Sequence, residues 1–437
     1  MNKKLIAKGI IEKLHQNGHD AVLAGGCVRD EVRGMAPRDY DIATSATPEQ
    51  VQKLFNKTIP VGVQFGVVIV LEQDLPVEVA TFRSEGKYID GRHPTEVKFT
   101  SLEQDAQRRD FTVNGLYFDF KTNQVVDLVG GLEDISKKII RSIGDPRERF
   151  QEDHLRILRA IRFAIQLDFE IDRETFEAGK TLAAQLKKVS PERIRDEISK
   201  SLTYGDPGKA IRLFDQMGVI PYIMPELETL KGVEQPSEYH PEGDVWIHTL
   251  MLLDQLKAPP LELVLGALLH DIAKPDTFVR AEDRIRFHGH DRIGAEKSEL
   301  ILKRLCFSNH QTDIICSLVR EHLRFKDAFQ MRVATLKRFF RLERFDWHLE
   351  LHRIDCLASH GKLDAYHFCK SKYEEFLKEP PPPTRIITGE DLIALGYQPG
   401  PTFKIILDKI EDEILEGRIH TKEEGLEYLK INFKKDL

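Results

Sequence analysis

Two aspartates separated by one residue follow a glycine-rich segment near the N-terminus. The segments LAGGCVRD and RDYDIAT succeed one another, and the second contains Asp39 and Asp41. Residues two apart on a strand point to the same face, so these carboxylates would offer the hard oxygen ligands that Mg²⁺ prefers. The glycine pair lets the backbone approach a phosphate closely, and Arg29 can donate a charge-assisted fork to it. Glu78, on a later expected strand, would add a third carboxylate to this face.

Such a carboxylate set indicates phosphoryl transfer. Two metal ions held in this way would activate an attacking hydroxyl and stabilise a pyrophosphate leaving group. A bare Asp-x-Asp pair is more often a solvated strand edge, and a Gly-Gly pair is often only a turn. The combination of GGCVRD with the two aspartates favours catalysis, with Asp39, Asp41 and Glu78 as the catalytic carboxylates.

A second candidate site is the pair Asp153 and Arg156, three residues apart in a strong helical pattern that predicts one shared face. An ionised Asp only accepts hydrogen bonds and Arg only donates them. Adenine and cytosine present an exocyclic amine beside a bare ring nitrogen, which suits this pair. Uracil and guanine present a carbonyl beside an N–H, so both contacts would meet the wrong partner. The alternative is an ordinary ion pair on a solvated helix.

A third set lies in the second half of the chain and combines imidazoles with carboxylates. Two of each suit a divalent metal of intermediate hardness. The candidate ligands are His248, His270, Asp271 and Asp355. His288 and His290 could add ligands or phosphate contacts. The alternative is a helical domain that packs these residues without holding a metal.

Apolar runs and chain-breaking residues predict an α/β head followed by a helical body. Short apolar or β-branched runs bounded by turn residues predict strands, in chain order 21–23, 67–71, 77–82, 113–120 and 124–128. Apolar residues at intervals of three and four predict helices through 147–202 and 246–376. A proline run at 379–383 predicts a linker, and a helical tail follows from Gly389.

Length and composition fit a soluble globular protein. The 437 residues suggest about three domains at roughly 150 residues each. The formal net charge of −7 excludes nucleic-acid binding by bulk charge but not a local basic cleft. The N-terminal segment predicts an amphipathic helix rather than a signal peptide, and no apolar run is long enough for a membrane helix. Five scattered cysteines without a CxxC pair indicate a reducing cytoplasm.

The order of motifs points to a family. GGCVRD, RDYDIAT, VEVATFR, RRDFTVN and EDHLRILRAIR follow one another over the first half of the chain. This order resembles the bacterial class II tRNA nucleotidyltransferases, the CCA-adding enzymes, and the related bacterial poly(A) polymerases. The resemblance implies Mg²⁺ on Asp39 and Asp41. It also implies nucleotide contacts from Gly26, Arg29, Arg109, Asp153, Arg156, Arg159 and Arg162.

The histidine–aspartate set resembles the HD superfamily of metal-dependent phosphohydrolases, which implies a second divalent metal in the body. The expected fold class is therefore α+β, with a nucleotidyltransferase head on a mixed or antiparallel sheet and an all-α remainder. We expect a catalytic head at 1–145 and a helical neck at 146–235 that binds the nucleotide base and RNA. An HD-type domain at 236–378 and a tRNA-binding tail at 379–437 would follow. Residues 85–93 predict a mobile loop, which such enzymes use in switching from C to A.

The implied activity is addition of CCA to the 3′ end of tRNA from CTP and ATP, with Mg²⁺ and release of pyrophosphate. The implied partners are ATP, CTP and the acceptor arm and elbow of tRNA, recognised by shape, with no membrane. A poly(A) polymerase or an A-adding enzyme shares the head motifs and stays open. A protein of another class, an HD phosphohydrolase with an inactive transferase head, is the further alternative.

Overall fold

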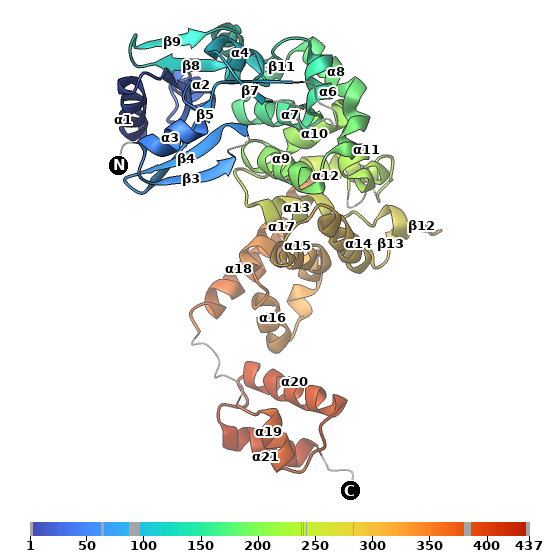
Figure 1. The fold of residues 1–437 in the computed structure, drawn as a ribbon. Coiled ribbons are helices and arrows are strands. Elements are labelled where there is room, and N and C mark those ends of the chain that lie inside the picture. The colour runs from blue at the N-terminus through green and yellow to red at the C-terminus, as the bar shows by residue number, and fades with distance from the viewer. Residues whose placement is uncertain are drawn as a thin grey trace. The chain divides into compact units, whose positions relative to one another are not determined.

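The computed structural model describes residues 3–62, 65–86, 97–236, 238, 240, 241, 243–282, 284–379 and 386–433. The chain divides into two compact units, whose elements are labelled in Figure 1. The first unit is Met1–Thr229 with Leu256–Leu261 and Ile301–Phe307, and the second is Leu230–Gln255, Glu262–Leu300 and Ser308–Leu437. No helix in the described part of the chain has the length and apolar character needed to cross a bilayer.

A seven-stranded mixed sheet forms the centre of the first unit. Its strand order is β3-β4-β5-β2-β1-β8-β9, and every neighbouring pair is antiparallel except β2 and β5. The strands are β1 (Ala21–Ala24), β2 (Asp41–Thr44), β3 (Thr58–Gly62), β4 (Val67–Glu72), β5 (Leu75–Thr81), β8 (Leu116–Asp119) and β9 (Gln124–Asp127). The predicted mixed sheet and its strands are therefore confirmed, with shifts of a few residues at the ends.

Both faces of this sheet are buried, as the alternation of side chains along β1 shows. Ala21 and Leu23 pack in one core with helices α1 (Lys3–Gln16), α2 (Gly26–Val32) and α3 (Pro48–Leu54). Val22 and Ala24 join a second core that includes Ala106 of α4 (Leu102–Gln107). The predicted N-terminal amphipathic helix is α1, whose apolar side chains face the first core.

The remainder of the first unit is helical. Its helices are α5 (Gly131–Lys137), α6 (Pro146–Glu152), α7 (Arg156–Leu167), α8 (Arg173–Leu182), α9 (Pro191–Thr203), α10 (Pro207–Gln216) and α11 (Ile220–Ile223). Short 3₁₀ turns are η2 (Thr112–Asn114), η3 (Ala183–Lys188) and η4 (Pro225–Leu230). Two small pairings complete it: antiparallel β6 (Arg83–Glu85) with β7 (Val97–Phe99), and parallel β10 (Ile139–Ile140) with β11 (Glu170–Ile171).

The helix predicted through Asp153 and Arg156 is interrupted, so the prediction of one continuous helical face was wrong. Helix α6 ends at Glu152, Asp153 has an extended backbone, and α7 begins at Arg156. The Asp153 carboxylate accepts a hydrogen bond from the Leu155 amide at 3.1 Å. Such a local side-chain bond competes with helical hydrogen bonding and explains the break.

The second unit is helical, and its helices continue into a C-terminal group. The helices are α12 (Val245–Asp254), α13 (Leu261–Leu269), α14 (His290–Arg304), α15 (Asn309–Glu321), α16 (Val333–Phe340), α17 (Phe345–Ala358), α18 (Asp364–Phe376), α19 (Gly389–Ala394), α20 (Pro401–Leu415) and α21 (Lys422–Asn432). The 3₁₀ segments are η5 (Pro275–Thr277) and η6 (His322–Gln330). The predicted helical tail is confirmed by α19–α21, which share an apolar core.

One element of this unit was not expected from the sequence. Strands β12 (Phe278–Arg280) and β13 (Ile285–Phe287) form a small antiparallel hairpin inside the region predicted to be helical. Each strand is only three residues long, with β12 exposed and β13 half-buried, so neither gives a clear helical or strand period in the sequence. The predicted proline linker and most of the predicted mobile loop fall on 380–385 and 87–96, outside the described residues.

Candidate active site

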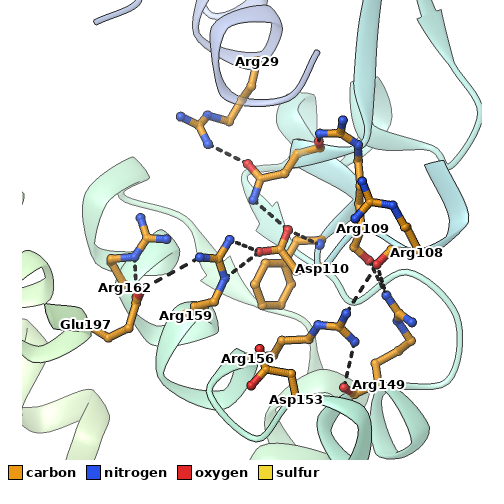
Figure 2. Close-up of polar contacts among 12 residues, drawn as sticks. Arg29, Arg108, Arg109, Asp110, Arg149, Asp153, Arg156, Arg159, Arg162 and Glu197 are labelled. Atoms are coloured by element: carbon orange, nitrogen blue, oxygen red, sulfur yellow. Dashed lines mark hydrogen bonds and ion pairs between the residues drawn. The ribbon is translucent and has the colours of Figure 1, made fainter. Parts of the chain in front are cut away.

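A cavity of about 1160 Å³ in the first unit collects the residues that the sequence assigned to nucleotide, metal and catalysis. Its walls come from β1, β2, β5, α2, α7 and α9 and from the segments between them. The predicted residues that line it are Gly26, Arg29, Asp39, Asp41, Glu78, Arg109, Asp153, Arg156, Arg159 and Arg162. Several of these are drawn in Figure 2. Residues from five separate motifs thus face one space.

The glycine turn between β1 and α2 forms a tight part of this wall. Gly25 has a φ of 73°, and a Cβ there would lie 2.9 Å from Nη1 of Arg109. Arg29, one turn into α2, is buried, and its Nη1 donates to Oδ1 of Asn114 at 2.6 Å. The turn therefore needs glycine at residue 25 both for its backbone and for the space that Arg109 takes.

The candidate metal carboxylates lie on two neighbouring strands and the loop before them. Asp41 opens β2, and Glu78 lies on β5, where Val79 pairs with Ile42 in parallel register. Asp39 lies before the strand, so the expectation that Asp39 and Asp41 point to the same face of one strand is not met. The reason is that β1 ends with Ala24 opposite Asp41, which leaves no ladder partner before it.

The electrostatics of these carboxylates suit a cation. Desolvation raises the pKa of Asp41 to about 6, the negative charges of Glu78 and Asp39 add to the rise, and Arg109 opposes it. Asp39 is exposed, and its Oδ1 lies 2.8 Å from Nζ of Lys3. The described head residues form no closed cluster of three ligands. An open pair still fits Mg²⁺, which takes one or two carboxylates together with substrate phosphates.

Arg109 is held at the cavity wall by Asp105, an acid near the end of α4. It donates to Asp105 Oδ2 at 3.2 and 3.3 Å and to the Tyr117 hydroxyl at 3.0 Å. Burial raises the pKa of Asp105, but the charges of Arg109 and Arg108 outweigh it and leave this pKa below its usual range. The guanidinium is thus fixed by a carboxylate that stays ionised.

Arg159 and Arg162 follow one another on α7, and each has a buried acidic partner. Arg159 Nη2 lies 2.5 Å from Asp110 Oδ2, and Arg162 Nε lies 2.5 Å from Glu197 Oε2, as Figure 2 shows. Burial raises the pKa of Asp110, but the positive charge of Arg159 outweighs it and holds this pKa well below its usual range. Both arginines are therefore oriented before any anion binds.

The candidate base-reading pair has intramolecular partners of its own. Arg193 Nη2 on α9 donates to Asp153 Oδ2 at 2.8 Å. Arg156 Nη1 donates to Glu152 Oε2 at 2.7 Å and to the Arg149 carbonyl at 2.9 Å. These contacts fix the carboxylate and the guanidinium toward the cavity, although the two residues share no helix.

Sequence reasoning missed the residues that orient this site. Asp110, Glu197, Arg193 and Asn114 hold Arg159, Arg162, Asp153 and Arg29 respectively. Asp110 and Asn114 belong to the RRDFTVN block, which was the one signal available for them. Glu197 and Arg193 belong to no motif. Their roles follow from the packing of α9 against α7.

The histidine–aspartate set forms a separate cluster within the second unit. His248 Nε2 lies 3.0 Å from Asp355 Oδ1, and His270 Nε2 lies 3.1 Å from Asp271 Oδ2. His290 also enters the cluster, with its Nε2 3.3 Å from Asp271 Oδ1, whereas His288 is exposed. His322, which the sequence analysis did not name, completes it. The chemistry of these nitrogen and oxygen donors fits a divalent metal.

Three family models match successive parts of the chain. The Poly A polymerase head domain matches residues 21–141, and the probable RNA and SrmB-binding site of polymerase A matches 168–231. The HD domain matches residues 243–356. The first match contains the carboxylates of the cavity, and the third contains the histidine–aspartate cluster.

Relatives extend over almost the whole chain. A CCA-adding enzyme of Streptococcus sanguinis is 32% identical over 416 residues, which cover 93% of this chain and 92% of that protein. A CCA-adding enzyme of Anoxybacillus flavithermus is 32% identical over 439 residues, covering 98% of each. The crystal structure of the Bacillus stearothermophilus CCA-adding enzyme in complex with CTP aligns at a TM-score of 0.75 and 28% identity, covering 98% of each chain. Full-length similarity of this kind shows that the chain belongs to the CCA-adding enzymes, which are tRNA nucleotidyltransferases.

Proposed function

We propose that this chain adds C, C and A in turn to the 3′ end of tRNA, with CTP and ATP as substrates and pyrophosphate as product. The observation that carries this proposal is the shared cavity. The carboxylates Asp39 and Asp41 and the donor–acceptor pair Asp153 and Arg156 line one space. The named activity of the relatives and the CTP complex of a solved relative support it.

The transfer step joins the tRNA 3′-hydroxyl to the α-phosphorus of the nucleotide. The hydroxyl oxygen forms a bond to phosphorus, and its proton passes to water. The bond from that phosphorus to the bridging oxygen breaks, and pyrophosphate leaves with the electron pair of that bond. Members of this family depend on divalent metal, and we assign Mg²⁺ to Asp39 and Asp41 with Glu78 beside them. Bound there, it would supply charge neutralisation and acidify the attacking hydroxyl.

The triphosphate would lie among the cavity arginines. Arg29, Arg109, Arg159 and Arg162 all line the space, and each is oriented by a hydrogen bond to a fixed partner. Guanidinium groups give bidentate contacts to phosphate oxygens. Since these side chains are already positioned, they need little reorganisation to stabilise the charge that develops on the departing pyrophosphate.

The base would be selected by Asp153 and Arg156. The carboxylate accepts from the exocyclic amine of C or A, and the guanidinium donates to the adjacent ring nitrogen. Arg193 uses one oxygen of Asp153 and leaves further lone pairs on the carboxylate for a base. With UTP or GTP, the carboxylate would face a carbonyl oxygen and the guanidinium would face an N–H, so neither group would have a hydrogen-bond partner. Leaving polar groups unpaired and shielded from water is costly in free energy.

We assign the head to 1–145, the neck to 146–235, the HD-type domain to 236–378 and the tail to 379–437. We also propose that the acceptor arm and elbow of tRNA are recognised by shape, since A-form duplexes expose little sequence information to side chains. The reaction would take place in the cytoplasm, where CTP, ATP and unfinished tRNA occur together.

A nucleotide-supply experiment tests this function. A tRNA ending before CCA is given labelled CTP alone, ATP alone or both. The proposal expects two C from CTP alone and growth by three nucleotides, then arrest, with both. Unlimited A from ATP alone would show a poly(A) polymerase, and A added only to tRNA ending in CC would show an A-adding enzyme. His270→Gln, in the other unit, is the matched control that keeps incorporation.

A further inference from the structure

The ring of Phe163 lies among the arginines that line the cavity of the first unit. Phe163 belongs to α7, is 6% exposed and lines the same cavity. The guanidinium carbons of Arg162, Arg159 and Arg29 lie over this ring, 3.9, 5.4 and 5.6 Å from its centroid. Arg29 comes from α2 and the other two arginines from α7, and all three are labelled in Figure 2. One buried ring therefore gathers three cations from two helices.

This ring offsets a repulsion between the arginines that it contacts. Burial lowers the pKa of the Arg162 guanidinium, and the positive charge of Arg159 lowers it further, whereas Glu197 opposes both effects. A cation over an aromatic face is attracted by the negative charge of the π electrons, most strongly where water is excluded. Arg29, Arg162 and Phe163 are each less than a tenth exposed, so these contacts are of the strong kind.

An aromatic face also holds a guanidinium group without using its N–H donors. Arg162 donates from Nε to Glu197 and from Nη1 to Gln166, and these two hydrogen bonds use two of its five N–H groups. A further carboxylate in place of the ring would take up more of these donors. The ring therefore helps to hold the guanidinium group while its other N–H groups can meet the oxygens of a phosphate.

Phe163 is itself held in place by Phe111. The two ring centroids are 5.8 Å apart and the ring planes meet at 74°, which is the edge-to-face arrangement that aromatic pairs favour. Phe111 is fully buried and belongs to the RRDFTVN block. The position of the Phe163 ring is thus set by packing before any ligand enters the cavity.

The remaining arginine that we assign to the triphosphate shows the same pattern. The guanidinium carbon of Arg109 lies 4.9 Å from the ring centroid of Tyr117. All four of these arginines therefore lie over aromatic rings. Arg156, which we assign to the base, is held instead by Glu152 and by a backbone carbonyl.

We propose that Phe163 is a positioning residue for the triphosphate, because its ring holds Arg29, Arg159 and Arg162 together at one wall of the cavity. This role rests on the proposed function, which assigns these arginines to the phosphates. The affinity of the cavity for a pyrophosphate group then depends on the π-electron density of a side chain that has no polar atom.

Fluorination of this ring tests the role in the full-length chain, since fluorine withdraws π-electron density with little change in size. Mono-, di- and trifluorinated phenylalanine are placed at residue 163, and calorimetry without metal measures the Kd of inorganic pyrophosphate. We expect the Kd to rise stepwise with the number of fluorines, by about tenfold or more for the trifluorinated ring. The same series at Phe214, which is buried on α10 outside the cavity, should leave the Kd unchanged. Phe163→Leu, which is apolar but has no π face, should weaken binding at least as much as the trifluorinated ring.

Different failures of this experiment have different meanings. A constant Kd across the series at residue 163, an equal rise at Phe214, or full affinity in Phe163→Leu would overturn the role of Phe163 and leave the proposed function intact. If the unaltered chain does not bind pyrophosphate in competition with CTP, the assignment of the arginines to the triphosphate is wrong, and the role of Phe163 falls with it.

Discussion

Arg193 and Asp153 are joined by a 2.8 Å hydrogen bond from Nη2 to Oδ2, across the gap between α9 and the break before α7. This contact places a positioning residue behind the carboxylate that we assign to base reading. Asp153 has no helix of its own to hold it, because α6 ends one residue earlier. The selectivity of the cavity should therefore depend on a residue that lies 40 positions further along the chain.

Arg193→Gln should weaken both turnover and base choice. A hydrogen bond to a charged group contributes about 1.5–3 kcal/mol, so we expect kcat/KM for CTP to fall about tenfold or more. The ratio of CTP to UTP incorporation should fall as well, because a loose Asp153 can rotate away from a mismatched carbonyl. Arg193→Lys should recover part of the loss. Arg195→Gln, on the same helix but outside the cavity, is the control. An equal effect of Arg195→Gln would contradict the positioning role of Arg193.

Glu197→Gln should destabilise the first unit. Arg162 and Glu197 are 7% and 3% exposed, and removing one partner of a buried ion pair costs about 3–5 kcal/mol. Hydrogen exchange of α7 and α9 should accelerate accordingly. Asp196→Asn, at an exposed neighbouring residue, should stay within about 0.5 kcal/mol of the parent. Unchanged exchange in Glu197→Gln would show that the pair does not couple these helices.

Asp41→Asn should separate binding from chemistry. The variant keeps the arginines that we assign to the triphosphate, so CTP affinity measured by calorimetry without metal should change little. Incorporation should fall by about a thousandfold or more, which corresponds to about 4 kcal/mol of lost metal-assisted stabilisation. Retained incorporation would refute the assignment of Asp41 as a metal ligand.

Mild acid should destabilise the second unit through His348. Desolvation lowers the pKa of this buried histidine to about 4, and the Arg324 charge adds to the effect. In the unfolded chain this histidine protonates near pH 6.5. Its contribution to stability is therefore complete above that pH and falls as the pH drops toward 4. At pH 5 this one group should lower the free energy of unfolding by about 2 kcal/mol.

Fluorescence can measure this loss, since the only two tryptophans, Trp246 and Trp347, both lie in the second unit. The urea midpoint should fall between pH 7 and pH 5. His348→Leu should make this dependence less steep, whereas His367→Leu, an exposed control, should leave it unchanged. An identical pH slope in His348→Leu would contradict the assignment.

The sequence was most informative where chemistry and local structure use the same short motif. GGCVRD predicted a backbone able to approach a phosphate closely beside Arg29, and Gly25, with its positive φ, lines the cavity together with Gly26 and Arg29. The alternating strands around Glu78 were confirmed because period-two patterns depend on nearest neighbours. Helical spacing failed at Asp153 because a side-chain hydrogen bond ends the helix there, which periodicity does not record.

The residues that could not be foreseen act across the fold. Glu197 reaches Arg162 over 35 positions and Arg193 reaches Asp153 over 40. His322 begins a 3₁₀ segment without a motif, yet its imidazole faces Asp271. Each of these residues is of a common type and lies in a helical segment whose sequence contains no motif. Their roles therefore appeared only when packing placed an unlike charge or a ligand set beside them.

The central claim is that one cavity both transfers nucleotides and selects C and A without a nucleic-acid template. The most direct test offers a tRNA ending before CCA an equal mixture of all four nucleoside triphosphates and sequences the product ends. The account predicts CCA followed by arrest from the unaltered chain, and it predicts U or G at these positions from Asp153→Asn, whose amide can also donate. Frequent U or G from the unaltered chain, or the same strict CCA from Asp153→Asn, would contradict it.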